Sequence, residues 1–272
     1  MIDTSGMSPI LAFGLINRER DLFETGIKKD PVSSREIASF REKIGTIKTV
    51  EDLTADFEVF SFVMKAYGFE DLVYGKAMMQ RILVTDPNEK SSLAARMNSG
   101  AFKEMTRELG FAADGSAPEK FAHSTWVDGM VERYVDQRLI DTQSDVSPAV
   151  GNALHFQSKA AGIKSWYDVL GDKRLSEFMR TALGLPEDIA AGDVDAQAEL
   201  FARKMDITDL QDPEKVEKLI ARYTAIRDAL DAQSPENNLV TALFSSTTAT
   251  GSWNAVTIDL GLIAGYSARQ TR

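Results

Sequence analysis

The run FREKIGTIKTVEDLTADFEVFSFVMKAYGF, residues 40–69, returns 116 positions later as FQSKAAGIKSWYDVLGDKRLSEFMRTALGL, residues 156–185. The two copies align without a gap, and over the wider window that begins at Ile37 nine of 33 aligned pairs are identical. The separation is far longer than the 20–50 residues of a solenoid repeat. The sequence therefore predicts that one helical subdomain has been duplicated.

Each copy of the run carries residues that begin and end helices. A Ser or Thr stands three residues before an aspartate, close to a capping box, and the next aspartate can accept from the first turn of a second helix. A glycine then follows the last periodic residue, and an Asp-Pro pair, which matches at an offset of 126, opens a later helix. The predicted structural caps are Thr49, Asp52, Asp56, Gly68, Asp86, Ser165, Asp168, Asp172, Gly184 and Asp212.

Between these caps the apolar residues recur with the helical period of 3.6, and almost nothing alternates as a strand would. We therefore predict an all-α fold of two related helical repeats, packed as an elongated or bilobed helical array. The first repeat covers residues 10–112 and the second covers residues 126–231, while residues 232–272 form a linker and an apolar C-terminal tail. A further helix is expected to start at residues 33–36.

The composition is that of an acidic globular protein without cysteine. The chain has 272 residues and a net charge of −10. Such a surface disfavours nucleic acid and anionic lipid, because both are bound through Lys and Arg. No stretch is long and apolar enough to span a membrane. The N-terminal residues also lack the basic region of a secretory signal peptide, so we expect no such signal.

No catalytic, cofactor or metal site can be recognised in the sequence. The two histidines, His123 and His155, have no second histidine at ligand spacing, and we expect both to be partly exposed and without special chemistry. Motifs for nucleophiles and for phosphate binding are missing as well. We therefore predict a protein that is not an enzyme and that binds no cofactor or metal.

Two lysines and the chain end are the candidates for interaction. Lys48 and Lys164 recur at equivalent positions of the two copies, where each docks an acidic partner, forms an ion pair within its own chain, or is simply solvated. After a small polar stretch, residues 245–252, an apolar segment packs either on its own body or on a partner. The apolar positions of that segment are Val256, Ile258, Leu260, Leu262 and Ile263.

Residues 40–87 resemble a bacterial family, the domain of unknown function 1217. The matching elements are Phe40-Arg41, residues 47–53 (IKTVEDL), Phe62, Lys65-Ala66, residues 68–71 (GFED) and residues 83–86 (LVTD). Members of this family often carry a duplicated domain, and several are labelled flagellar or are encoded among flagellar genes. The resemblance therefore implies a flagellum-associated protein, related to the basal body or rod, and it implies no known activity.

Three hypotheses of function remain open. The first is a non-catalytic structural or protein-interaction protein that binds flagellar components or further copies of itself, located in the flagellum basal body and exported without a signal peptide. The second is an adaptor or export chaperone in the cytoplasm, for which an acidic helical protein with an apolar groove suffices. The third is an enzyme on a helical scaffold, which would need a deep pocket with perturbed carboxylates.

Deleting residues 245–272 is expected to weaken partner binding or self-association, because apolar residues beyond a polar stretch are suited to contact another surface. Sedimentation velocity and pulldown of the full and shortened chains measure the two effects. An unchanged oligomeric state together with unchanged binding would contradict this prediction.

Overall fold

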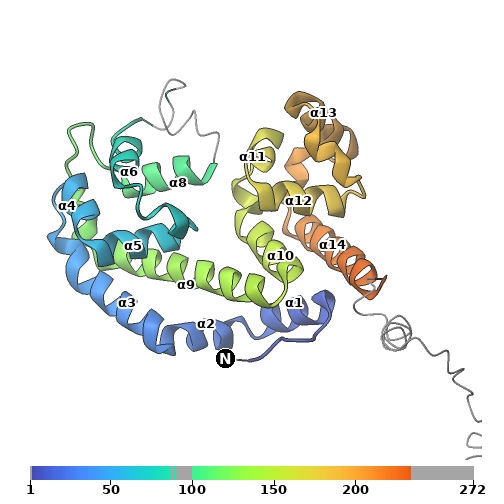
Figure 1. The fold of residues 1–272 in the computed structure, drawn as a ribbon, viewed down its shortest axis with the longest axis horizontal. Coiled ribbons are helices and arrows are strands. Elements are labelled where there is room, and N and C mark those ends of the chain that lie inside the picture. Colours follow the sequence, from blue (N-terminus) through green and yellow to red (C-terminus); the bar gives the residue numbers. More distant parts are fainter. Residues whose placement is uncertain (1, 87–88, 90–99, 234–272) are drawn as a thin grey trace, which may run out of the picture. The chain divides into compact units, whose positions relative to one another are not determined.

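The computed structural model describes residues 2–86, 89 and 100–233 of the chain (Figure 1). The chain divides into two compact units, Met1–Asp228 and Ala229–Arg272. The second unit begins within the last described helix, so the repeats and their packing are described here within the first.

The described residues form helices joined by short loops, and the predicted all-α fold is confirmed. The first copy contains α1 (Pro9–Arg18), α2 (Arg20–Lys29), α3 (Pro31–Lys43), η1 (Ile44–Thr46), α4 (Val50–Ala55), α5 (Phe57–Ala66), η2 (Glu70–Leu72), α6 (Lys76–Leu83), α8 (Gly100–Leu109), η3 (Glu119–Ala122) and α9 (Ser124–Val146), where η marks a short 3₁₀ helix. Among the described residues, extended pairing is limited to one antiparallel bridge between Thr49 and Ser116.

The second copy begins at α10 (Pro148–Lys159) after a short connection and has no counterparts of α1 and α2. The sequence placed its start at residue 126, but α9 packs on α5 and belongs to the first copy. The elements that follow α10 are η4 (Ala160–Gly162), α11 (Trp166–Leu170), α12 (Lys173–Ala182), η5 (Glu187–Ala191), α13 (Val194–Lys204), η6 (Ile207–Gln211) and α14 (Pro213–Gln233). Thus α3, α4 and α5 of the first copy have counterparts in α10, α11 and α12 of the second.

Both copies of the repeated run begin their short helix with a capping box. Thr49 Oγ1 accepts from the backbone N–H of Asp52 at 3.1 Å, and the Asp52 carboxylate accepts from the backbone N–H of Thr49 at 2.9 Å. Ser165 and Asp168 make the same pair of bonds at 3.3 and 2.9 Å. Each box occupies donors that the first turn of a helix leaves without an internal partner.

The following helix also begins and ends in the same way in both copies. Asp56 caps α5 and Asp172 caps α12, each by accepting from two backbone N–H groups of the first turn. Gly68 and Gly184 then end these helices with φ of 74° and 66°. A side chain is strained in this left-handed region, which explains why both copies keep glycine there.

Helix α3 begins earlier than the sequence predicts. We expected a start at residues 33–36, but the Asp30 carboxylate accepts from the backbone N–H groups of Val32 and Ser33 at 3.1 and 3.0 Å. Pro31 is the first helical residue, where its missing N–H costs no hydrogen bond. The prediction was wrong because Asp30-Pro31 is the stronger start signal, and Ser33 lies buried in the first turn.

Two further predicted caps have different outcomes. Asp212 accepts from the backbone N–H of Glu214 at 3.0 Å, at the start of α14. Asp86 is exposed, and the helix predicted to follow it lies outside the described residues. The five apolar tail positions, Val256, Ile258, Leu260, Leu262 and Ile263, also lie outside them.

A stack of three buried aromatic rings lies at the centre of each copy. The ring centroids are 4.2 and 4.3 Å apart in the first copy and 3.9 and 4.3 Å apart in the second. Each stack joins two phenylalanines from the repeated run to a tyrosine from a later long helix. The rings are Phe40, Phe62 and Tyr134 in the first copy, and Phe156, Phe178 and Tyr223 in the second.

The stacks show that α9 and α14 are equivalent, and we call them the closing helices. Because Tyr134 and Tyr223 hold the same place, the two helices correspond at an offset of 89. The neighbouring positions agree in character, since Val127, Met130 and Val131 correspond to Val216, Leu219 and Ile220. We call α3 and α10, which carry the first ring of each stack, the opening helices.

The two copies meet where the closing helix α9 packs against the opening helix α10 (Figure 1). Gly151 of α10 lies so close to α9 that a Cβ there would be 2.0 Å from Ser144 Oγ and 2.7 Å from Ser144 Cα. Ser144 is held in place, because its Oγ accepts from Arg174 at 2.7 Å and donates to the Ile140 carbonyl at 2.6 Å. Only glycine permits this approach.

Phe62→Ala is expected to lower the free energy of unfolding by about 3–5 kcal/mol, because it leaves a cavity in the middle of a buried stack. Phe57→Ala on the same helix is the matched control, since that ring is 49% exposed, and it should change the stability by about 0.5 kcal/mol or less. Urea denaturation followed by circular dichroism measures both, and equal effects would contradict the prediction.

Gly151→Ala is expected to destabilise the protein by about 1–3 kcal/mol, because the new methyl group must push the two helices apart. Gly129→Ala on α9 is its control, since a Cβ there would meet nothing within 4 Å. Removing glycine from that open helical position should stabilise the protein by about 0.5–1 kcal/mol. Thermal unfolding that moves in the same direction for both variants would be inconsistent with a close helix crossing at Gly151.

Candidate functional site

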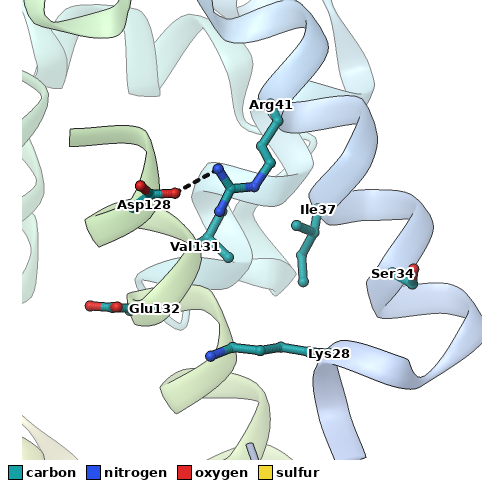
Figure 2. A pocket seen from close by; sticks show the side chains of 7 residues that line it. All are labelled: Lys28, Ser34, Ile37, Arg41, Asp128, Val131 and Glu132. Carbon is teal, nitrogen blue, oxygen red and sulfur yellow. Dashed lines mark ion pairs between the residues drawn. The ribbon is translucent and has the colours of Figure 1, made fainter. Parts of the chain in front are cut away.

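Each copy has a slot between its opening helix and its closing helix. The first slot, of about 380 Å³, is lined by Lys28, Ser34, Ile37, Arg41, Asp128, Val131 and Glu132 (Figure 2). The second slot, of about 430 Å³, lies between α10 and α14 and is also lined by α1 and by the 3₁₀ helices η4 and η6. The slots therefore recur in equivalent places of the duplicated fold.

The residues at the two slots correspond one to one at three positions. The offset of 116 relates the opening helices, and the offset of 89 relates the closing helices. The corresponding pairs are Arg41 with Gln157, Asp128 with Glu217, and Val131 with Ile220. Both slots thus keep an apolar residue and a carboxylate on the closing helix, whereas the opening helix has replaced an arginine by a glutamine.

The first slot is bridged by an ion pair. Figure 2 shows Arg41 reaching from α3 to Asp128 on α9, with its Nη1 2.6 Å from Asp128 Oδ1. The side chains are 44% and 54% exposed, so the pair contributes about 0–1 kcal/mol to stability. Its main consequence is geometric, because the guanidinium spans the gap above Ile37 and Val131.

The second slot has no such bridge within the described part of the chain. Glu217 is exposed at its edge, and no described residue forms an ion pair with it. Gln157 lines the slot, and its Oε1 is buried without a hydrogen-bond partner. The apolar walls come from Phe13 on α1 and from Val216 and Ile220 on α14. This slot is therefore largely apolar, with the polar side chains of Asn17, Gln157 and Gln211 in its lining and one exposed carboxylate, that of Glu217, at its edge.

Neither Gln157 nor Glu217 was among the residues predicted from the sequence. The signal was present at the offset of 89, where VDGMVERY at residues 127–134 resembles VEKLIARY at residues 216–223. Three of these eight pairs are identical, and three others exchange similar residues. The match is short, and its meaning depends on the ring stacks, which show that the closing helices are equivalent.

The most extensive described ion network joins three helices away from the slots. Glu104 on α8 lies 2.8 Å from both Arg133 on α9 and Lys159 on α10. Arg133 also pairs with Glu108 at 2.7 Å and lies over the ring of Tyr67, 4.7 Å from its centroid. Burial alone would raise the pKa of Glu104, but the charges of Lys159 and Arg133 lower it. The network favours the ionised form of Glu104 and links the two copies.

The prediction that both histidines are partly exposed is wrong for His155, which is buried. Its Nε2 lies 2.7 Å from Oδ2 of Asp172, the residue that also caps α12. Burial alone would raise the pKa of Asp172, but the hydrogen bond and charge of His155 lower it. The prediction failed because periodicity did not show that α10 faces the start of α12. His123 is exposed.

The two recurring lysines lie on the surface. Lys48 is exposed, with its Nζ 3.4 Å from the Gly45 carbonyl oxygen, and Lys164 is exposed as well. Within residues 2–86, 89 and 100–233, no three His, Asp or Glu side chains gather as a metal site would require. No helix in the same residues is long and apolar enough to cross a membrane.

The comparisons with known proteins agree with one another. The family described as "Protein of unknown function (DUF1217)" matches residues 66–216. An Agrobacterium tumefaciens protein, whose crystal structure was determined by the Northeast Structural Genomics Consortium, has a similar fold with a TM-score of 0.74. It is 33% identical in sequence, over 81% of this chain and 93% of its own. No match was found among curated proteins.

Proposed function

This chain belongs to the DUF1217 family of proteins of unknown function, and we propose that it acts there as a non-catalytic interaction protein associated with the bacterial flagellum. Its partners are other proteins, either flagellar components or further copies of the chain. The proposed site of action is the basal body or the rod.

The observation that carries the interaction role is the second slot. It is mostly apolar, and the exposed carboxylate of Glu217 at its edge has no ion-pair partner among the described residues. A groove of this kind suits an inserted protein segment, for which apolar contact supplies affinity and a few polar groups supply orientation. The flagellar assignment is supported separately, by the resemblance of residues 40–87 to a family with flagellar members.

A cytoplasmic adaptor or export chaperone is the second candidate, and the same slot supports it. Export chaperones hold amphipathic segments of their clients in an apolar groove. The acidic balance of the chain, with a net charge of −10, would favour basic clients. Location separates the two candidates, because a chaperone stays in the cytoplasm whereas a basal-body protein remains with the flagellar structure.

Affinity purification of the tagged chain from cells that are assembling flagella should recover basal-body or flagellar export proteins, identified by mass spectrometry. Cells in which flagellar gene expression is switched off provide the control. Fractionation then distinguishes the candidates, since the tagged chain co-sediments with purified basal bodies in one case and stays cytoplasmic with a bound client in the other. Recovery of no flagellar protein would contradict the flagellar role.

A further inference from the structure

Because the fold is duplicated, the second slot can be compared with the equivalent slot in the first copy. In the first copy, Arg41 of the opening helix lies against Asp128 of the closing helix, and the chain itself fills the edge of the slot. In the second copy the carboxylate is kept as Glu217, but Gln157 stands in place of the arginine. The second slot therefore contains the equivalent carboxylate but no equivalent of the Arg41 guanidinium.

The carboxylate at the edge of the slot is the group that a partner can reach. Gln157 and Glu217 both line the second slot, but the Oε1 of Gln157 is buried whereas Glu217 is exposed. A carboxylate only accepts hydrogen bonds. A cationic group that enters at this edge therefore supplies the donor that Glu217 does not receive from the described residues.

Apolar surface continues from the slot along α1. Phe13 lines the slot, and Ile10, one turn earlier on the same helix, is 44% exposed. Residues three apart lie on one face of a helix, so Ile10 extends the apolar wall beyond the slot. The volume of about 430 Å³ falls in the range of sites that admit a small ligand or a few side chains.

We propose that the second slot binds an apolar protein segment of a partner, which places an arginine or lysine against Glu217 as Arg41 lies against Asp128 in the first copy. Apolar side chains of that segment pack at Val216, which is partly exposed, and along the exposed Ile10 of α1. The net charge of −10 favours a cationic segment over an acidic one. The proposal names the partner chemistry for the interaction role and rests on that role.

A pair of synthetic peptides tests the proposal on the full chain. One is a 12-residue alanine–leucine peptide with leucines spaced for one helical face, one central arginine and polar Gly-Ser ends. Its twin carries glutamine in place of the arginine. Fluorescence anisotropy of the labelled peptides measures binding to the wild-type chain and to variants whose circular dichroism and thermal unfolding match the wild type.

The arginine peptide should bind the wild-type chain roughly tenfold more tightly than its twin does. Glu217→Gln should remove this difference. Gln157→Arg should weaken the arginine peptide by a similar factor, because it restores the internal cation found in the first copy. Glu214→Gln is the matched control, since it removes an exposed carboxylate from the same helix outside the slot, and it should leave both affinities unchanged.

Three outcomes would overturn the proposal: no binding of the arginine peptide, equal binding of the twins, or equal loss in Glu214→Gln and Glu217→Gln. Self-association of the chain that disappears in Glu217→Gln would also overturn it, because a second copy would then occupy the slot. If the arginine peptide binds as predicted but the affinity purification recovers no flagellar protein, the proposal for the slot stands and the flagellar role is contradicted. If the purification recovers flagellar proteins but the peptide does not bind, only the proposal for the slot is contradicted.

Discussion

The position of every helix around each core depends on one contact, the insertion of a tyrosine from a late long helix beside two stacked phenylalanines. The phenylalanines come from the repeated run, 22 residues apart in both copies, as in Phe40 and Phe62. The tyrosine comes from a helix that is far along the chain, and its burial holds the closing helix against the other two. Offset stacking adds specificity to the burial of three large rings. The slot is then the space that remains where the opening and closing helices do not touch.

The ring stack also explains why the slots recur. In both copies the opening and closing helices are held together by equivalent rings, so a gap between them forms at an equivalent place. Equivalent positions of the two helices then face that gap in each copy. Whether a slot is bridged depends on the side chains at those positions. In the first copy Arg41 spans the gap to Asp128, whereas the shorter, neutral Gln157 leaves Glu217 without a cation from the described part of the chain. One difference between equivalent positions of a duplicated scaffold therefore separates a slot with an internal ion pair from a slot without one.

The parts of this structure that could be predicted from the sequence are those determined within a few residues of chain. The capping boxes at Thr49 and Ser165 and the left-handed glycines need only neighbours three or four residues away, so their pattern is visible in a single sequence. The burial of His155 depends on which face of α10 meets α12, and the partner of Arg41 is 87 residues away. Such contacts follow from tertiary packing, which periodicity does not specify. Even the local rules compete, since Asp30-Pro31 prevailed over the weaker start signal at residues 33–36.

The difference between the two slots bears on which copy a partner would contact. The first copy is held by pairs that the chain provides for itself, such as Arg41 with Asp128 and Arg20 with Asp136 at 2.8 Å. The ion network around Glu104 then ties this copy to the first helix of the second. A partner that entered the first slot would have to break an existing pair, whereas a partner that entered the second would supply a missing one. The proposed partner therefore meets no competing internal cation at the second slot, whereas at the first slot it would have to displace Arg41.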